Sequence, residues 1–160
     1  MLIDVHAHLD HYEDRLDEAL AEIERHRILT ISNSMDLASY KRNLEISEMC
    51  SLVLPTFGVH PWNALEYADR LDDLSEAIEL SPMIGEIGLD YYRDLSPRPA
   101  QRAALTAQLA LADRVGLPVV FHVRDAWTEI LGHIDRCGVP RARGVLHAFS
   151  GDAAAVRWAR

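Results

Sequence analysis

Residues 2–9 read LIDVHAHL, a short and largely apolar run of the length and composition typical of a buried strand. Apolar residues then recur at helical spacing at Leu16, Ala19, Leu20 and Ile23, with charged residues on the opposite side. This pattern predicts an amphipathic helix after the strand. A strand followed by such a helix is the repeating unit of folds built on a parallel sheet.

The same unit recurs along the whole chain. Further strand-like runs lie at residues 28–34, 52–60, 83–89, 119–123 and 144–149. Helical spacing separates them, with apolar sets at Leu37, Tyr40 and Leu44; Leu71, Leu74 and Ile78; Leu105, Leu109 and Ala112; and Trp127, Ile130, Leu131 and Ile134. We therefore predict six strands, five complete helices and a sixth helix that starts near residue 152. An open doubly wound sheet and an incomplete eight-unit barrel both fit this pattern.

Length and charge limit the possible functions. The chain has 160 residues, enough for one domain over residues 1–160, and a net charge of −9. A chain this acidic has no basic surface that would hold nucleic acid by charge alone. We find no secretion signal and no apolar run long enough for a membrane span, so we expect a cytoplasmic protein without a membrane partner. Cys50 and Cys137 are expected to be reduced thiols.

Ionisable residues interrupt the apolar strands near their C-terminal ends. His6 and His8 alternate along the first strand, so both side chains point to one face. Burying an unpaired ionisable group costs several kcal/mol, roughly 2–7 even for a neutral polar group. A metal site would offset that cost, and we expect the same site to include Glu86, His122 and His147.

Other ionisable residues are expected to have different roles. We place His11, His26 and His133 at the solvent-exposed surface, in loops or on helices. Asp4 is expected to be a structural or supporting group deeper in the sheet, rather than a ligand. Imidazoles and carboxylates without thiolates favour Zn²⁺ or Mn²⁺, and Mg²⁺ where water supplies further ligands.

Five motifs occur in a fixed order: DVHAHL at 4–9, GVHP at 58–61, GEIGLDYY at 85–92, HVR at 122–124 and HAFSG at 147–151. Together they resemble the TatD family of metal-dependent hydrolases. The resemblance implies a TIM-barrel fold of the amidohydrolase type and a centre of one to three divalent ions. It also implies hydrolysis of DNA phosphodiester bonds by a metal-activated water, often from the 3′ end.

The resemblance also implies roles for individual residues. Glu86 would act in catalysis and bridge two ions, while His60 and Arg124 would face the substrate phosphate. A salt bridge to Asp125 or Glu129 is the alternative for Arg124. The metal ligands would be His6, His8, Glu86, His122 and His147.

One lysine separates two branches of these hydrolases. Other amidohydrolase-type enzymes bridge their metals with a carboxylated lysine on the fourth strand, but the single lysine here, Lys41, falls in the second helix. The fourth strand instead offers Glu86. The carboxylated-lysine branch is therefore disfavoured.

The chain departs from the family pattern after residue 151. TatD-type proteins continue for roughly a hundred residues, in line with a full barrel, and carry there an aspartate that completes the first metal site. Without that segment we expect about six of eight β-α units: a fragment, a half-barrel completed by another copy or chain, or a rearranged smaller sheet. Self-association through open edges would follow. The alternatives to a single-strand or frayed-end deoxyribonuclease are a catalytically incomplete metal-binding fragment or partner subunit, and a hydrolase of another ester or amide.

Overall fold

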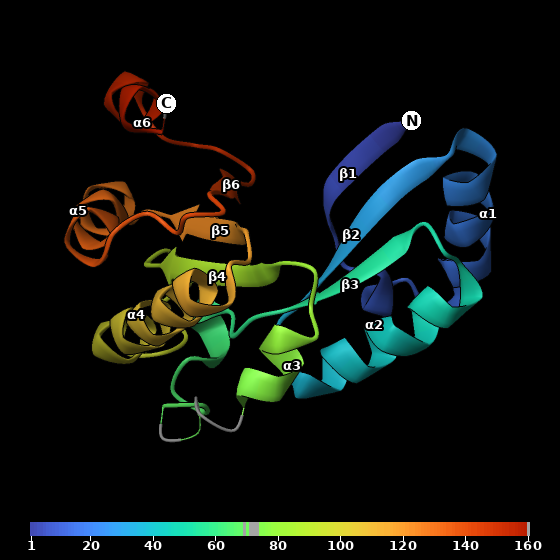
Figure 1. Cartoon of the computed structure of the whole chain (residues 1–160), viewed down its shortest axis with the longest axis horizontal. Coiled ribbons are helices and arrows are strands. Elements are labelled where there is room, and N and C mark those ends of the chain that lie inside the picture. The colour runs from blue at the N-terminus through green and yellow to red at the C-terminus, as the bar shows by residue number, and fades with distance from the viewer. Residues whose placement is uncertain (69, 71–73, 160) are drawn as a thin grey trace.

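In the computed structural model, which describes residues 1–68, 70 and 74–159, six strands form one parallel sheet in the order β1-β2-β3-β4-β5-β6 (Figure 1). Strand neighbours in space are therefore also neighbours in sequence. A doubly wound sheet reverses its strand order near the middle, whereas a barrel keeps the sequence order. The structure is thus an open, incomplete barrel-type sheet. The strands are Leu2–Ala7, Ile28–Ser34, Val53–Phe57, Ile84–Asp90, Val119–Arg124 and Gly144–Leu146.

Helices connect successive strands, as the alternating pattern predicts. Figure 1 shows α1 and α2 alongside β1–β3, and α4 and α5 alongside β4 and β5. Asp36 caps α2, where its side chain accepts a hydrogen bond from the backbone N–H of Ser39 at 2.8 Å, and this confirms the expected helix start. The helices are Leu16–His26, Leu37–Met49, Ser75–Glu79, Arg98–Val115, Trp127–Cys137 and Ala153–Trp158, numbered α1 to α6 in that order.

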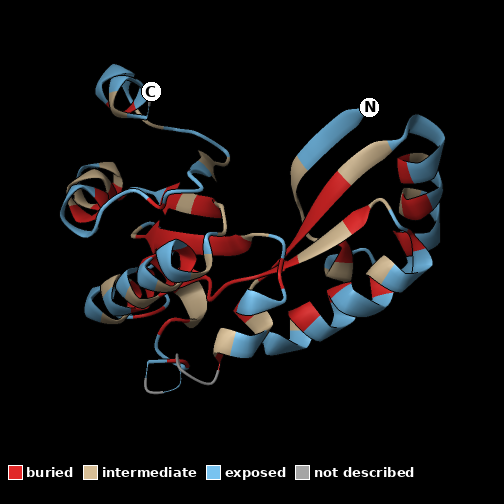
Figure 2. Cartoon of the chain, viewed as in Figure 1, coloured by how far each residue is buried: buried red, intermediate tan, exposed pale blue. Residues whose placement is uncertain are grey.

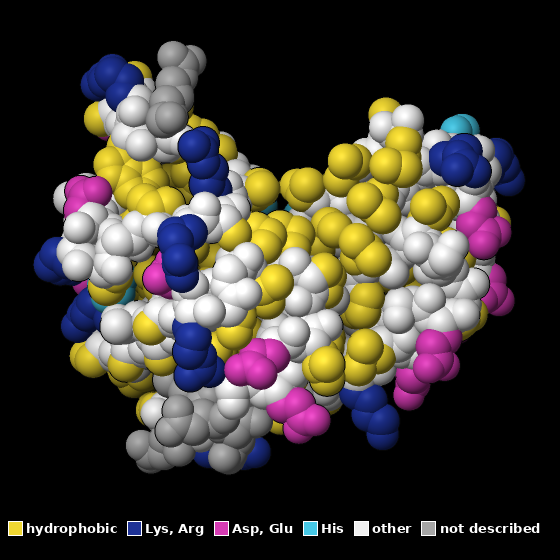
Figure 3. Space-filling view, viewed as in Figure 1, with side chains coloured by type: hydrophobic (Ala, Val, Ile, Leu, Met, Phe, Trp, Pro, Cys, Tyr) yellow, Lys and Arg dark blue, Asp and Glu magenta, His cyan; other side chains and the backbone are white. Residues whose placement is uncertain are grey.

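Burial is greatest in the middle of the sheet. Every residue of β4 is buried, whereas β1 starts with three exposed residues and β6 with one (Figure 2). The larger hydrophobic core joins β3–β5 to α3, α4 and α5, and a smaller one packs α1 and α2 against β3. Figure 3 shows a hollow between the part of the molecule that carries β1–β3 and the part that carries β4–β6. The middle of the sheet is therefore the rigid base for the polar groups near its strand ends.

The buried face of α2 differs from the prediction. Leu37 and Leu44 are exposed, and only Tyr40 of the three expected residues is buried. Asn43 and Ile46 complete the buried face. The Asn43 amide bonds with two serine hydroxyls of β2, at 2.7 and 3.0 Å, so a polar residue occupies a core position. A hydrophobic pattern cannot reveal such a position, because burial there depends on a hydrogen-bond partner.

The sequence predicts that His11, His26 and His133 are exposed to solvent. The prediction for His133 is wrong. The side chains of His11 and His26 are 59% and 56% exposed, as expected. His133 is only 7% exposed, because α5 packs its face against α4, and its Nε2 lies 2.9 Å from Thr106 Oγ1. It shares that face with Ile130, three residues earlier. Of the predicted third helix, Leu71 lies outside the described residues, and Ile78 is buried in α3.

Candidate metal centre

Of the expected histidines and Glu86, three residues lie on strands and three follow strand ends. His6 is in β1, Glu86 in β4 and His122 in β5. The predicted strands at 2–9, 52–60 and 144–149 end earlier, at Ala7, Phe57 and Leu146, so His8, His60 and His147 come just after them. The histidines nevertheless lie in the C-terminal halves of their strands or just after them, where parallel β/α folds gather their chemistry, and Glu86 is the third residue of β4.

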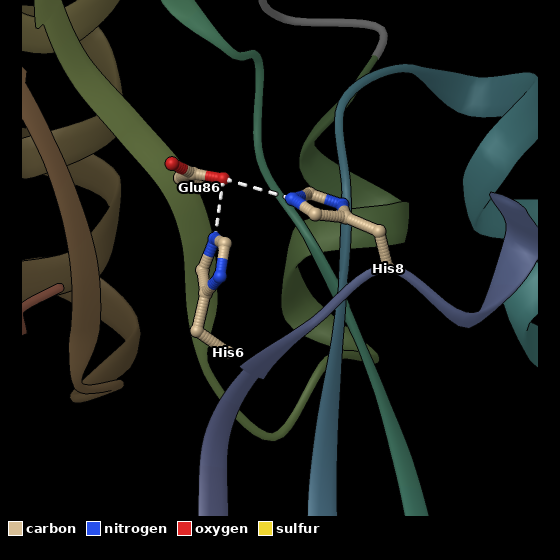
Figure 4. Close-up of side chains that lie close together, drawn as sticks. All are labelled: His6, His8 and Glu86. Atoms are coloured by element: carbon tan, nitrogen blue, oxygen red, sulfur yellow. Dashed lines mark hydrogen bonds and ion pairs between the residues drawn. The ribbon is translucent and has the colours of Figure 1, made fainter. Parts of the chain in front are cut away.

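Glu86 is the centre of the group. Its side chain is 2% exposed and sits between glycines, at positions 85 and 88, in the middle of the sheet. Oε2 of Glu86 lies 2.8 Å from His6 Nε2 and 3.4 Å from His8 Nε2 (Figure 4). Oε1 contacts His147 Nε2 and lies 2.6 Å from His122 Nδ1. The two oxygens of one carboxylate thus face two separate pairs of imidazoles.

Hydrogen bonds on the far side of two rings determine which nitrogen faces Glu86. His8 Nδ1 donates to the Asn33 carbonyl oxygen at 2.8 Å. His122 Nε2 lies 3.0 Å from Asp90 Oδ2, a buried carboxylate that also accepts from Trp62 Nε1 at 2.7 Å. Each ring therefore turns its other nitrogen toward Glu86. A nitrogen lone pair and a carboxylate oxygen repel each other at such distances unless a proton or a cation lies between them.

The pKa shifts follow from this crowding. Burial alone would raise the pKa of Glu86, but hydrogen bonds from His122, His147 and other imidazoles hold it far below its usual value. Burial would lower the pKa of His8 and His122, but in both cases the nearby Glu86 carboxylate outweighs burial and raises it. In the absence of a cation, the Glu86 charge favours protons on the His8 and His122 rings. A divalent cation would replace those protons.

His60 is the most buried of the histidines near Glu86. Its Nδ1 accepts a hydrogen bond from the Trp62 backbone N–H at 3.2 Å, and its Nε2 lies 3.8 Å from Glu86 Oε1. Burial lowers the pKa of His60 to about 3, so the ring is neutral; because Nδ1 accepts the Trp62 N–H, its one proton is on Nε2, the nitrogen that faces Glu86. His60 therefore lies beside the proposed ligands and is buried, whereas a residue that contacts substrate at the entrance of the site would be exposed.

Two sets of donors share the Glu86 carboxylate. His6, His8 and Glu86 form one, and His60, Glu86 and His122 form the other, with the donor atoms of each set within 4.8 Å of one another. His147 adjoins the second set, because its Nε2 lies 3.3 Å from His122 Nδ1. Imidazole nitrogens with one carboxylate fit Zn²⁺ or Mn²⁺, and Mg²⁺ with added water. The donor set therefore fits divalent metal ions.

Arg124 ends β5 beside this centre and is exposed to solvent. Its guanidinium carbon lies 4.0 Å from the centroid of the Tyr92 ring. Within the described part of the chain Arg124 forms no ion pair, and Glu129 instead pairs with Arg102 at 2.9 Å. The guanidinium therefore keeps donors free for an anion.

Sequence reasoning missed two supporting residues, Asn33 and Asp90, and misplaced Asp4. Asp90 follows Glu86 by four residues in one strand, so strand alternation places both side chains on the same face. This spacing could have identified Asp90 from the sequence. Asn33 acts through its backbone carbonyl, which no side-chain pattern reveals. Asp4 was expected deep in the sheet, but it is exposed and accepts a hydrogen bond from the His6 backbone N–H at 3.0 Å.

Comparisons with known structures agree with the fold. The crystal structure of YjjV, a TatD homologue from Escherichia coli K12, matches with a TM-score of 0.86 at 28% identity, covering 98% of this chain and 63% of that one. A mutant organophosphorus hydrolase matches with a TM-score of 0.62 at 14% identity, which shows the barrel-type fold alone. The fold and the histidine–glutamate cluster define a metal-dependent hydrolase of the barrel type.

Sequence comparisons then identify the family. The family model described as TatD related DNase matches residues 3–160, and the chain belongs to this family. The metal-dependent hydrolase YabD of Bacillus subtilis is 34% identical, over 98% of this chain and 64% of its own length. The human deoxyribonuclease TATDN3 is 30% identical, over 94% of this chain and 61% of its own length. The 3′-5′ ssDNA/RNA exonuclease TatD of Rahnella is 38% identical over 60% of this chain.

The chain therefore spans less than two thirds of these relatives. Within its described residues, no helix has the length and apolar character needed to cross a bilayer.

Proposed function

We propose that the chain acts as a metal-dependent deoxyribonuclease that hydrolyses phosphodiester bonds from the 3′ end, as a single α/β domain over residues 1–160. The observation that carries this proposal is the division of the Glu86 carboxylate, with Oε2 facing His6 and His8 and Oε1 facing His122 and His147. A carboxylate placed in this way is suited to bridge two ions. The names of TatD from Rahnella and human TATDN3 support nuclease chemistry.

The proposed ligands are His6, His8, Glu86, His122 and His147, and the proposed ions are Zn²⁺, Mg²⁺ or Mn²⁺. Divalent ions in such a centre polarise the phosphodiester and lower the pKa of a nearby water. Glu86 holds the centre together, and Asn33 and Asp90 fix the ring nitrogens that face it. Arg124 binds the substrate phosphate through its free guanidinium donors, while His60 lies deeper on the substrate side.

A second function has support from the length of the chain. Relatives extend well beyond the matched region, since only 64% of YabD and 61% of TATDN3 are covered. A catalytically incomplete metal-binding fragment or partner subunit would bind ions without turning over. Hydrolysis of another ester or an amide at the same centre is a further alternative, because water activation does not by itself select phosphorus over carbon.

We further propose that the chain associates with itself through the open edges β1 and β6. DNA with single-stranded or frayed ends is the proposed substrate, which the name of the single-strand exonuclease TatD from Rahnella supports. Both cysteines are free, Cys50 buried and Cys137 exposed, which supports the reducing cytoplasm as its compartment.

Metal content tests the centre first. We expect one or more divalent ions per chain by elemental analysis of protein purified without chelator, and a clear loss of ions in Glu86→Gln. Glu48→Gln is the matched control, because Glu48 lies on the exposed side of α2. Wild-type protein without any bound ion would contradict the metal centre.

Hydrolysis of 5′-labelled single-stranded DNA tests the reaction. We expect products shortened from the 3′ end, with the rate reduced on the order of a hundredfold or more in Glu86→Gln. Unchanged hydrolysis in this variant would rule out the proposed chemistry. Bound ions without turnover on DNA, RNA or simple esters would favour the fragment or partner subunit.

A further inference from the structure

Arginine is concentrated in the half of the chain that carries β4 to β6. Residues 83–160 contain ten Lys and Arg against eight Asp and Glu, whereas residues 1–82 contain six against seventeen. The acidic net charge thus comes from the N-terminal half, away from Arg124. A polyanion that contacts Arg124 therefore meets the half of the chain with the smaller excess of negative charge.

The first exposed aromatic ring of this half is Tyr92, two residues after β4. Tyr92 is 58% exposed, and the Arg124 guanidinium carbon lies 4.0 Å from its ring centroid. Buried Asp90 holds the Tyr92 backbone, because its Oδ1 accepts from the Tyr92 N–H at 3.0 Å. The same carboxylate contacts His122 through Oδ2 at 3.0 Å. The position of the Tyr92 backbone is therefore tied to the proposed metal ligands.

The second exposed ring is Phe149, two residues after His147. Phe149 is 40% exposed and packs on Trp127 at a centroid distance of 4.7 Å. Trp127 is the first residue of α5, and its Nε1 donates to Ser150 Oγ at 3.3 Å. Phe149 thus has a rigid aromatic support and a surface open to solvent.

A cavity of about 280 Å³ lies beside Arg124, whose guanidinium contacts Tyr92, and beside Ala148 and Ser150, the sequence neighbours of Phe149; its lining is His122, Val123, Arg124, His147, Ala148 and Ser150. It is smaller than the pockets of about 300–1,000 Å³ that enclose whole drug-sized ligands. It would hold one small group, such as a phosphate, beside two proposed metal ligands and Arg124. The rest of a ligand would extend outward, toward the two exposed rings.

We infer that Tyr92 with Arg124, and Phe149 with Trp127, form two base-stacking platforms on either side of the phosphate cavity. The inference rests on the proposed function and adds the residues that stack on the bases next to the bound phosphate. Aromatic rings stack on the flat faces of any base, so binding would depend on bases without depending on their sequence. Paired bases within a duplex do not offer these faces, so the platforms would select unpaired ends.

Binding of fluorescein-labelled oligothymidylate and of an equally long abasic backbone to the full chain tests the platforms. We expect Tyr92→Ala and Phe149→Ala each to weaken oligothymidylate binding by about fivefold to a hundredfold. Binding of the abasic strand should stay unchanged in both variants. Tyr92→Phe and Phe149→Tyr retain a ring and should bind oligothymidylate like wild type.

Leu80→Ala is the control for loss of an exposed apolar side chain, because Leu80 is 73% exposed before the start of β4. Metal content, measured in parallel, should equal that of wild type in every variant. Equal binding of oligothymidylate by wild type and both alanine variants would overturn the platforms, as would equal weakening on the abasic strand. If the chain hydrolyses DNA but binds oligothymidylate and the abasic strand equally well, the platforms are refuted and the proposed reaction is not. If it binds oligothymidylate more tightly than the abasic strand but hydrolyses neither, the platforms are supported and the proposed reaction is refuted.

Discussion

At the scale of single residues, the metal centre depends on side chains that would not bind the ions. Asp90 has no exposed surface, and it joins Trp62 Nε1, His122 Nε2 and two backbone N–H groups of the following turn. These hydrogen bonds keep its pKa below the usual value, although burial would raise it. Asp90 is therefore a charged acceptor that directs His122 Nδ1 toward Glu86.

Asp90→Asn tests this positioning role. The asparagine would keep a carbonyl oxygen for part of the network, but its NH₂ group would meet the His122 N–H, donor against donor, and turn the ring. We expect about tenfold to a hundredfold weaker metal binding, measured by titration with Zn²⁺ or Mn²⁺. Asp94→Asn, at a half-exposed carboxylate that pairs with Arg98, is the control. Wild-type affinity in Asp90→Asn would show that His122 orientation does not depend on this carboxylate.

His133 gives a pH prediction that is independent of the metal centre. Burial between α4 and α5 lowers its pKa, with Arg136, Glu129 and Arg102 as the charged groups that face it. The unfolded chain then binds the proton more readily, so His133 contributes stability above the ordinary histidine pKa that is lost as pH falls below it. We expect thermal melts between neutral pH and about pH 5 to show a smaller decrease in Tm for His133→Gln than for wild type. An equal decrease in both proteins would contradict the prediction, and His26→Gln on exposed α1 is the control.

At the scale of secondary structure, glycine sets the distance between β4 and β5. Gly88 has φ +151°, and a Cβ there would lie 1.9 Å from the His122 carbonyl oxygen. Gly88 pairs with His122 in the parallel register, so this close approach helps bring Glu86 to the His122 ring. Only a residue without a side chain fits.

Three glycine substitutions distinguish the stability cost of an unfavourable φ from the cost of a steric clash with the neighbouring strand. Gly88→Ala should destabilise the fold by well over about 1 kcal/mol, because it combines an unfavourable φ with a backbone clash. Gly116→Ala, at φ +73° with open space around it, should cost only about 1 kcal/mol. Gly132→Ala, in the interior of α5, should stabilise by about 0.5–1 kcal/mol. Urea unfolding midpoints measure all three, and a Gly88→Ala protein as stable as wild type would contradict the close approach.

At the scale of the whole molecule, the sheet leaves two edges open. β1 and β6 each pair on one side only among the described strands, and their outer backbone groups have no strand partner. At the β1 edge Met1, Leu2 and Ile3 are 82%, 63% and 59% exposed. Apolar, unpaired edge strands favour association with another chain.

We predict that the 160-residue chain associates with itself. Static light scattering should give a mean mass that rises with protein concentration, and Ile3→Lys should reduce this rise because a charged edge opposes pairing. Leu80→Lys, at an exposed site away from β1, is the control. A monodisperse, highly stable monomer would contradict the prediction.

The sequence predicted the architecture well because the pattern of apolar residues reflects burial directly. Strand and helix order and the Asp36 cap follow from local spacing, and so does the placement of candidate histidines and Glu86 in or just after strands. The exact strand ends did not follow, since pairing stops at Ala7 and Leu146 although the apolar runs continue. The buried faces of α2 and α5 were partly wrong because Asn43 and His133 are buried through hydrogen bonds.

The sequence alone therefore determined the repeating β-α units, the family resemblance and the residue types that favour divalent metal. Only the tertiary structure decided the chain-order sheet, the division of the Glu86 oxygens between two pairs of imidazoles, and the roles of Asn33 and Asp90. The physical reason is the sequence separation over which each kind of interaction acts. Helical and strand periodicities are properties of neighbouring residues, whereas contacts such as His6 with Glu86, eighty residues apart, exist only after the strands have packed.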